Sequence, residues 1–256
     1  MPELPDIEVF SSNLSSLFEG KKLVKIKVVN GKKLQDTQQQ LSKALEGKIL
    51  KEVYRSGKEM RFKFSNGEIL GLHLMLTGDL IPFEKINERK STIVEFYFSN
   101  GKALALTDRM RNANIKLNPE DKEGVDALEI NYKSLKQILD RKANIKNVLL
   151  DQNVIRGIGN GYSDEILWET KISPFSRADA IPDDKVKQLA KNIKSVMKKA
   201  VSKISKAYPG LIHGEVRDFM NIHTKNKTKS PTGAPIKVEK RGMLKTYFTD
   251  EQVLYT

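Results

Sequence analysis

The sequence contains no cysteine and only three histidines in 256 residues. The lack of cysteine excludes disulfides, a cysteine nucleophile and thiolate metal ligands. The histidines, at positions 73, 213 and 223, are too far apart in sequence to suggest a metal cluster. No segment approaches the about 18 apolar residues of a membrane span, and the acidic start of the chain is unlike a signal peptide. We therefore expect no metal, no other cofactor and no membrane association.

Acidic residues are fewer than basic residues in this sequence. Lys and Arg number 45 against 32 Asp and Glu, which gives a formal net charge of +13. Such an excess favours a polyanionic partner, either nucleic acid or an anionic membrane surface. The alternative is a lysine-rich composition whose lysines are simply solvated. Hydrophobic residues make up 39% of the chain, which is enough to build a core and too much for a disordered chain.

The first half of the chain has the pattern of one helix followed by strands. Ile7, Phe10, Leu14 and Leu17 have helical spacing within residues 3–18. Short β-rich runs follow at 23–29, 60–65, 68–76, 92–98 and 102–107. Asn-Gly pairs, which are typical of hairpin turns, stand at 30–31, 66–67 and 100–101. Residues 1–117 are therefore predicted to form a helix and an antiparallel sandwich or barrel.

The second half changes character twice. Residues 118–130 are polar and acidic and predict a linker. Helical periodicity then returns within 131–220, at 134–142, 144–152, 163–171 and 183–206. The last of these segments has an apolar face and a lysine face, which we interpret as a solvated surface. Residues 221–256 have the pattern of a polar loop and a β-hairpin with Arg241 and Gly242 near its turn.

One short motif carries a chemical signal by itself. In RGIGNGYSDEIL, residues 156–167, Gly157 and Gly159 permit a close approach of backbone, and Asn160 precedes a predicted helix. A helix N-terminus beside an Asn side chain can bind a phosphate. The same motif also fits an ordinary joint between two helices, and its residues alone do not decide between the two.

Five segments carry a wider resemblance, and they are MPELPDIE at the start, RSGKEMRFKF (55–64), HLMLTGDL (73–80), residues 143–174 and GAPIKVEKRGMLKTYF (233–248). In this order and rough spacing they resemble the formamidopyrimidine-DNA glycosylase / endonuclease VIII family. The resemblance implies an α+β fold: an N-terminal helix with an antiparallel β-sandwich, a helix–two-turn–helix domain and a C-terminal β-hairpin finger. It also implies a DNA-binding cleft between the first two domains.

The resemblance implies an enzyme of base-excision repair, a DNA glycosylase with abasic-site lyase activity. Once Met1 is removed, Pro2 has a secondary α-amine that can attack C1′ of the damaged nucleotide as an iminium-forming nucleophile. Glu3 would act as general acid, and Lys58 matches a lysine that holds a phosphate near the lesion. The alternative from the residues alone is that Pro2 is the first helical residue and Glu3 a favourable charge at the helix N-terminus.

The remaining DNA contacts implied by the resemblance come from both halves of the chain. The DNA-binding set is Lys58, His73, Leu76, Met110, Arg111, Lys146, Asn160, Tyr162, Arg241 and Lys245. Asn160 matches the asparagine that binds the phosphate backbone. Lys146 matches a lysine near the lesion pocket, but it also fits a plain surface charge. Glu165 is matched too, although a structural carboxylate that caps nearby backbone explains it equally well.

The finger departs from the family pattern. The positions of the zinc-binding cysteines align with Lys229, Thr232, Thr249 and Gln252, so the resemblance is to the zincless-finger branch. The hairpin is then expected to be held by packing of Ile236, Val238, Tyr247 and Phe248. The arginine that clamps a phosphate aligns with Leu244, and Arg241 or Lys245 is left to supply the charge.

The wedge that fills the gap left by a flipped base also differs. Leu76, Met110 and Asn112 stand at the three wedge positions, so only Arg109 or Arg111 could contact the orphaned base. The chain between Asp218 and the finger is short, which argues against 8-oxoguanine and favours oxidised pyrimidines or abasic sites.

Two hypotheses follow from these departures. The first is a monomeric enzyme acting on damaged double-stranded DNA, in bacterial cytoplasm near the nucleoid or in a eukaryotic nucleus. The second is a specialised or non-catalytic relative that binds damaged DNA.

Overall fold

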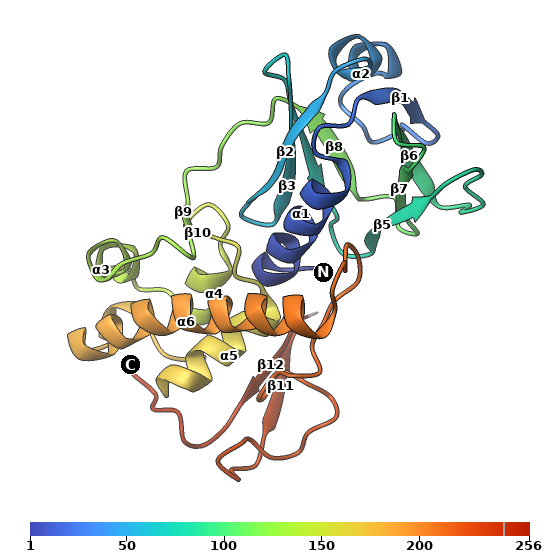
Figure 1. The fold of residues 1–256 in the computed structure, drawn as a ribbon. Helices are drawn as coiled ribbons and strands as arrows, with labels where there is room; N and C mark the ends of the chain where they lie inside the picture. Colours follow the sequence, from blue (N-terminus) through green and yellow to red (C-terminus); the bar gives the residue numbers. More distant parts are fainter. Residues whose placement is uncertain (243) are drawn as a thin grey trace. The chain divides into compact units, whose positions relative to one another are not determined.

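The computed structural model describes residues 1–242 and 244–256, and these fold as two compact units (Figure 1). Unit 1 comprises Met1–Asp121 together with Ile204–Glu215. Unit 2 comprises Lys122–Lys203 and Val216–Thr256. Residues 204–215, which the sequence pattern places in the helical region, therefore pack with the N-terminal unit.

Unit 1 is built from two four-stranded antiparallel sheets and two helices. The first sheet has the order β1 (Leu23–Val28), β6 (Thr92–Phe98), β7 (Ala103–Asp108) and β5 (Gly78–Phe83). The second has the order β2 (Leu50–Ser56), β3 (Glu59–Phe64), β4 (Ile69–His73) and β8 (Asn114–Leu117). The helices are α1 (Leu4–Phe18) and α2 (Gln38–Leu45). The predicted sandwich with its N-terminal helix is confirmed.

One apolar core joins the elements of unit 1. Ile7, Phe10 and Leu14, which the periodicity of α1 places on one face, are at most 1% exposed. They pack in one cluster with side chains from both sheets. Each such side chain contributes roughly 1.5–3 kcal/mol by leaving water, so the core fixes α1 and both sheets in one body.

The Asn-Gly pairs behave in two ways. Those at 66–67 and 100–101 turn the β3–β4 and β6–β7 hairpins, with Gly67 at φ 90° and Gly101 at φ 78°. The pair at 30–31 does not turn a hairpin, because the chain runs on through a loop into α2. Helix α2 begins with a capping box in which Thr37 Oγ1 accepts the N–H of Gln40.

Unit 2 is mainly helical. Its helices are α3 (Tyr132–Leu139), α4 (Ile145–Leu150), α5 (Asn160–Thr170), the 3₁₀ turn η1 (Ala178–Ala180) and α6 (Asp183–Ala207). Its strands are the short parallel pair β9 (Val125–Asp126) and β10 (Ile155–Arg156) and the antiparallel hairpin β11 (Lys237–Arg241) and β12 (Leu244–Phe248). The segment expected to be a plain linker, 118–130, thus contains β9.

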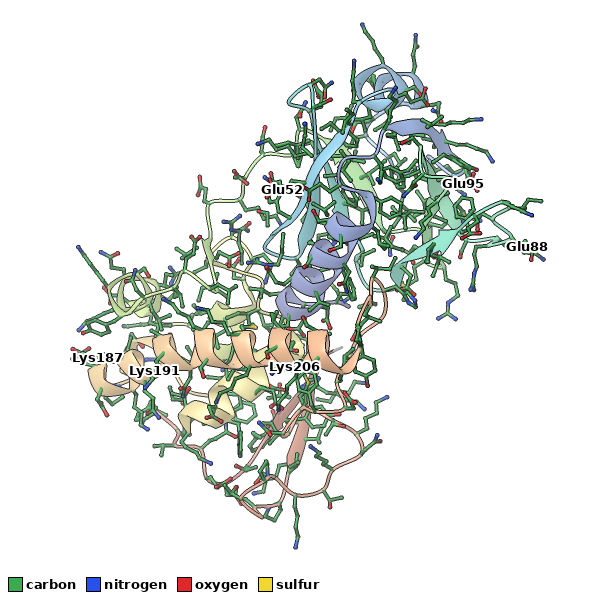
Figure 2. The ribbon with its side chains drawn as sticks, viewed as in Figure 1. Glu52, Glu88, Glu95, Lys187, Lys191 and Lys206 are labelled. Carbon is green, nitrogen blue, oxygen red and sulfur yellow. The ribbon has the colours of Figure 1, made fainter. Side chains whose placement is uncertain are left out.

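Helix α6 has the amphipathic arrangement that its sequence indicates. Leu189, Ile193 and Met197 are fully buried on one face. Lysines extend from the helix along its length, as Figure 2 shows for Lys187 and Lys191, and both are exposed. The solvated interpretation of the lysine face is therefore confirmed for these residues. Among the described residues, no helix has the length and apolar character needed to cross a membrane.

Candidate functional site

The N-terminal end of α1 holds the first two candidate catalytic residues. The helix begins at Leu4 with Glu3 as its N-cap, and Asp6 Oδ2 accepts the N–H of Glu3 at 2.8 Å. Pro2 therefore precedes the helix, and the interpretation of Pro2 as its first residue is wrong. Pro5 stands inside the first turn, where a proline costs little.

Both side chains are buried and lie directly beside each other in sequence. Glu3 is 4% exposed, and Pro2 is buried as well. The α-amino group of Met1 pairs with the carboxylate of Glu215. While Met1 is attached, the nitrogen of Pro2 is a tertiary amide and has no nucleophilic lone pair. Chemistry at Pro2 therefore requires removal of Met1, which is 36% exposed.

The tip of the β2–β3 hairpin positions Lys58. A two-residue turn of Gly57 and Lys58 joins Ser56 to Glu59, and Gly57 has φ 61°, as turns with glycine first require. Lys58 is only 8% exposed although it stands at a hairpin tip.

An arginine connects this tip to α1. Arg55 donates from Nε to Glu8 Oε2 at 2.6 Å and from Nη1 to the carbonyl of Gly57 at 3.2 Å. Glu8 lies one turn beyond the helix start that carries Glu3. This brace is not among the contacts predicted from the sequence. Arg55 stands within the RSGKE segment quoted for Lys58, so the signal was present.

Two loops of unit 1 present exposed apolar side chains. Leu76, between β4 and β5, is 56% exposed, and Met110, between β7 and β8, is 49% exposed. Arg111 is exposed beside Met110. His73, at the end of β4, accepts the N–H of Met75 through Nδ1 at 3.0 Å, so it shapes the first loop. The apolar wedge residues are thus at the surface, where the prediction requires them.

A basic hollow of about 240 Å³ lies next to Met110. It is lined by Asn30, Lys32, Lys33, Leu34, Ile93, Met110, Arg111 and Ala113. Lys33 Nζ donates to Asn112 Oδ1 at 2.5 Å, which ties the lysine to the loop of Met110. Lys32 and Lys33 are not among the site residues predicted from the sequence. Their position after an Asn-Gly pair had suggested an ordinary hairpin turn.

In unit 2, Asn160 is the first residue of α5 and contacts the C-terminal hairpin. Its Nδ2 donates to the carbonyl of Lys245 at 3.0 Å. Its Oδ1 is buried and has no hydrogen-bond partner within the described part of the chain. Gln152 shapes the preceding turn, accepting from the N–H of Gly157 at 3.0 Å and donating to the carbonyl of Ile158 at 2.8 Å. Asn160 and Lys245, predicted separately, are thus brought together.

Lys146 belongs to a buried network rather than to the surface. Its Nζ lies 2.6 Å from Asp164 Oδ1 and 2.8 Å from Thr246 Oγ1. The other oxygen of Asp164 contacts His223 Nδ1 at 2.7 Å and accepts the N–H of Tyr247 at 2.9 Å. The interpretation of Lys146 as a surface charge is wrong, and a DNA contact would compete with this ion pair. The network fastens β12 to α4 and α5.

Tyr162 and Glu165 also have structural surroundings. Tyr162 is 1% exposed, with the guanidinium of Arg217 5.3 Å from its ring centre. Burial on the inner face of α5 therefore places Tyr162 in the core, not at the surface where a DNA contact was expected. Glu165 accepts the backbone N–H groups of Asn221, Ile222 and His223 at 2.8–2.9 Å. This arrangement confirms its interpretation as a carboxylate that caps nearby backbone.

Packing holds the hairpin only in part as expected. Tyr247 is 6% exposed and packs with Trp168 and Ile222, and Ile236 packs against this cluster. Phe248 meets Phe175 edge to face at 5.0 Å. Val238, in contrast, is 52% exposed, so its expected packing role is wrong. Val238 is paired with Tyr247 across the hairpin and so shares its face of the sheet, but the packing around Tyr247 does not extend to Val238.

A carboxylate binds two of the four finger positions that align with the zinc-binding cysteines. Glu251 Oε2 accepts from Thr232 Oγ1 at 2.8 Å and from Thr249 Oγ1 at 3.1 Å. Its Oε1 lies 3.0 Å from Lys171 Nζ. Hydrogen bonds from Lys171, Thr232, Thr249 and Trp168 lower the pKa of Glu251 to about 2 against the opposing effect of desolvation. Glu251, which is not among the residues predicted from the sequence, joins the hairpin to the end of α5.

The hairpin also carries cations. Lys240 of β11 is paired in register with Lys245 of β12, and both are exposed. Like charges directly opposite each other destabilise a two-stranded sheet, so the pair is better suited to a bound anion than to the hairpin alone. Arg241 pairs with Leu244 in the backbone register, but its side chain lies outside the described part of the structure.

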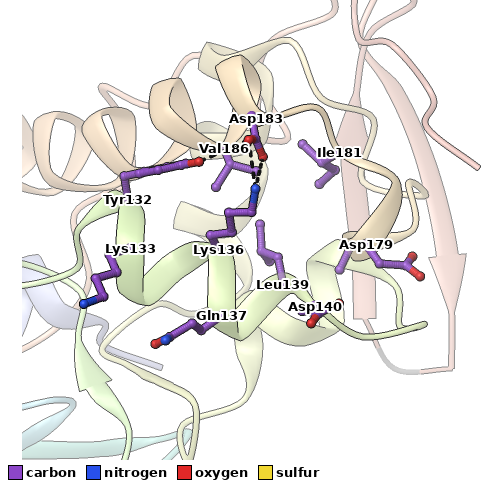
Figure 3. A pocket seen from close by; sticks show the side chains of 11 residues that line it. Tyr132, Lys133, Lys136, Gln137, Leu139, Asp140, Asp179, Ile181, Asp183 and Val186 are labelled. Atoms are coloured by element: carbon purple, nitrogen blue, oxygen red, sulfur yellow. Dashed lines mark hydrogen bonds and ion pairs between the residues drawn. The ribbon is translucent and has the colours of Figure 1, made fainter.

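A second hollow in unit 2, of about 480 Å³, contains none of the predicted site residues. It lies where α3 faces the start of α6 (Figure 3). The hydroxyl of Tyr132 and the ammonium of Lys136 both point at Asp183, at 3.2 Å and 2.6 Å. Asp183 and Lys136 of this lining thus form an ion pair with each other.

Comparisons with known structures identify the architecture. The fold matches that of a Lactococcus lactis Fpg bound to DNA containing an abasic site, with a TM-score of 0.86 at 22% identity over 98% of this chain and 99% of the other. A complex of LlFpg with THF-DNA and an inhibitor gives a TM-score of 0.88 at 25% identity, again over 98% and 99%. The fold class is therefore that of these DNA-bound enzymes.

Sequence comparisons then give the family. The model of the formamidopyrimidine-DNA glycosylase N-terminal domain matches residues 1–115, and that of the H2TH domain matches residues 123–208. The formamidopyrimidine-DNA glycosylase of Ligilactobacillus salivarius is 34% identical over 75% of each chain, and that of Mycoplasma genitalium is 30% identical over 88% of this chain and 86% of its own. The chain belongs to the formamidopyrimidine-DNA glycosylase family, whose members are DNA glycosylase/lyase enzymes of DNA repair. The resemblance found in the sequence is confirmed.

Proposed function

We propose that this protein removes oxidised pyrimidines from duplex DNA and cleaves abasic sites through an iminium formed by Pro2. The observation that carries the proposal is the placement of Pro2, which lies outside α1 and immediately before the N-cap Glu3. A nucleophile and a proton donor are therefore neighbours at the end of a rigid helix. Removal of Met1 would convert the Pro2 nitrogen into a secondary amine.

The chemistry follows from the two groups. The Pro2 amine forms a bond to C1′ of the deoxyribose as the glycosidic bond breaks, and the departing base takes up a proton. Glu3 delivers a proton to the sugar oxygen or to the base. Opening of the sugar ring at O4′ gives the iminium, which acidifies the C2′ proton. Loss of that proton and of the 3′ phosphate is the β-elimination, and addition of water to the iminium restores the amine. At an abasic site the base is already gone, so the amine condenses with the aldehyde directly.

DNA would be held by contacts in both units. Lys58 in unit 1 and Asn160 with Lys245 in unit 2 are suited to bind phosphates, which position the duplex and carry no sequence information. Leu76 and Met110 would enter the helix where the damaged nucleotide leaves it, as apolar wedges do. His73 supports the Leu76 loop, and Arg111 supplies a charge next to Met110.

The preference for pyrimidine lesions is supported by the chain after Asp218. Only three residues after Asp218 the backbone is already held by Glu165, which accepts the N–H groups of Asn221, Ile222 and His223. Lys227 Nζ then donates to the carbonyl of Met220 at 2.6 Å, which closes the segment on itself. The segment is thus short and fastened by hydrogen bonds, which argues against a long loop that would cap a flipped purine. We place the protein as a monomer on damaged duplex DNA, in the bacterial cytoplasm beside the nucleoid.

Borohydride trapping tests the mechanism. The chain is prepared without Met1, as checked by mass spectrometry, and incubated with abasic-site DNA and borohydride, which reduces an iminium to a stable covalent adduct. We expect an adduct, little adduct for Pro2→Gly and none for a chain that retains Met1. Glu3→Gln should impair removal of an oxidised pyrimidine far more than nicking of a preformed abasic site.

Three outcomes would contradict the proposal. Equal trapping of a chain that keeps Met1 would move the nucleophile to a lysine, with Lys58 the first to test. Damage-selective binding with no adduct under any condition would favour the alternative, a relative that only binds damaged DNA. Faster removal of 8-oxoguanine or formamidopyrimidines than of oxidised pyrimidines would refute the substrate preference.

A further inference from the structure

The two loops that present Leu76 and Met110 share an uncommon backbone feature. The β4–β5 loop has Met75 at φ 54°, and the β7–β8 loop has Arg111 at φ 54°. Residues other than glycine rarely adopt this left-handed conformation, and they keep it only where their surroundings impose it. Each loop is therefore held by specific contacts close to the exposed apolar side chain.

One carboxylate supplies those contacts to both loops. Asp108, the last residue of β7, is 1% exposed. Its Oδ1 accepts the hydroxyl of Thr77, in the loop of Leu76, and the N–H of Met110 at 2.9 Å. Its Oδ2 accepts the N–H groups of Asn112 at 2.6 Å and Ala113 at 2.7 Å. Asp108 thus binds the backbone on both sides of Arg111 and reaches across to the neighbouring loop.

The charge of Asp108 is maintained by this arrangement. Burial alone would raise the pKa of Asp108, but the hydrogen bonds from Thr77, Ala113, Asn112 and Met110 outweigh it and leave the pKa lowered. Hydrogen bonds to an ionised acceptor are stronger than those between neutral groups. The two loops are therefore joined through a carboxylate that stays ionised at neutral pH.

We propose that Asp108 is a positioning residue for base extrusion, which fixes Leu76 and Met110 as one rigid wedge. The proposal rests on the function proposed above, in which both side chains enter the DNA helix. A pre-ordered pair of loops loses less conformational entropy on entering the duplex than two independent loops do. Thr77 is the link between them, because its hydroxyl is the group through which the Leu76 loop reaches Asp108.

The test distinguishes loss of the hydrogen bond between Thr77 and Asp108 from a general loss of folding. Thr77→Val keeps the shape of the side chain and removes the hydroxyl, and Thr77→Ser retains it. Thr107→Val is the matched control, since Thr107 in β7 is 7% exposed and its hydroxyl meets the carbonyl of Asp79 at 3.4 Å, not Asp108. Asp108→Asn is a further variant, and its folding is checked by circular dichroism.

The readout is wedge insertion, which does not depend on catalysis. A duplex carries a tetrahydrofuran abasic analogue with 2-aminopurine beside it, and stopped-flow fluorescence follows the unstacking of that base. We expect Thr77→Val to slow the fluorescence rise by about tenfold, the factor that 1.4 kcal/mol represents, and Thr77→Ser to restore it. Affinity for the single-stranded oligonucleotide, which needs no wedge, should stay within about twofold of the wild type.

Two results would overturn the proposal. One is a Thr77→Val variant with wild-type kinetics, and the other is an equal slowing by Thr107→Val, which would mean a general effect on the sheet. Leu76→Ala and Met110→Ala distinguish a failure of the underlying function. If both variants leave the rate of the fluorescence rise unchanged, Leu76 and Met110 do not act as a wedge. If both variants slow the rise and Thr77→Val does not, only the role of Asp108 is rejected.

Discussion

Two lysines of unit 2 allow a sharp test of how burial determines the value of an ion pair. Lys146 lies 2.6 Å from Asp164, and Lys136 lies 2.6 Å from Asp183. The first pair is 6% and 0% exposed, and the second is 53% and 58% exposed. We expect Lys146→Met to destabilise unit 2 strongly and Lys136→Met to have almost no effect.

The magnitude follows from what each change leaves behind. Removing one partner of a buried pair typically costs about 3–5 kcal/mol, because the other charge stays buried without compensation. Asp164 keeps its contacts with His223 and with the N–H of Tyr247, so we expect the lower end, about 3 kcal/mol. The exposed partner of Lys136 is simply solvated by water.

Urea denaturation at pH 7, followed by tryptophan fluorescence, measures the difference. Trp168 is the one tryptophan of the sequence and lies in α5 of unit 2, 6% exposed, so it reports on this unit. With a slope of about 2 kcal/mol per M, the midpoint should fall by about 1.5 M for Lys146→Met. Equal shifts for the two variants would refute the reasoning. A duplex-binding salt slope that falls by about one for Lys146→Met would show that Lys146 contacts a phosphate instead.

Two further predictions concern the C-terminal hairpin. The pKa of Glu251 is about 2, against an ordinary 4.5, so its contribution to stability is complete above pH 4.5 and is lost as the pH falls toward 2. Glu251→Gln should therefore lower the melting temperature at pH 7, and the melting temperature of the variant should fall less steeply with pH below pH 4.5. Parallel plots of melting temperature against pH for the two proteins would contradict this. Lys240→Ala and Lys245→Ala should each reduce the slope of log K for duplex binding against log salt by about one. Asn160→Ala should weaken binding with little change in that slope, and filter-binding titrations across salt concentrations measure both effects. An unchanged slope for both lysine variants would place the hairpin away from the DNA backbone.

Local pattern was sufficient for much of the fold. The helical spacing near the N-terminus predicted α1, and the turn at Arg241 and Gly242 predicted the hairpin, because one-face burial and turn geometry depend on nearby residues. Strand β5 was missed. It contains Pro82, which fits a strand only at an edge, and β5 is the edge strand of its sheet. Pairing with β7 supplies what local propensity lacks.

The site shows a different limit. The sequence indicates that Lys146 and Glu165 matter, but not whether they meet DNA or the protein, because that depends on residues distant in the chain. The partner of Lys146 is 18 residues away, and the backbone that Glu165 caps begins 56 residues away. The sequence nevertheless contains a usable signal, because two adjacent carboxylates, Asp164 and Glu165, directly precede the apolar residues 166–168 in a segment that is predicted to be a helix. The structure shows that this helix is largely buried. Buried charges need partners, so both had to bind something.

The same adjacent carboxylates explain how the hairpin is held without cysteine. Asp164 binds the N–H of Tyr247 in β12, while Glu165 binds the backbone that leads toward β11. Glu251, at the far end of the hairpin, gathers hydroxyl groups and an ammonium around one charge. A thiolate metal site holds such a hairpin through one cation and several anions. Here the signs of the charges are reversed: each carboxylate is a single anion that accepts hydrogen bonds from several donor groups. Because the pKa of Glu251 lies near 2, its ion-pair anchor remains charged across the physiological pH range.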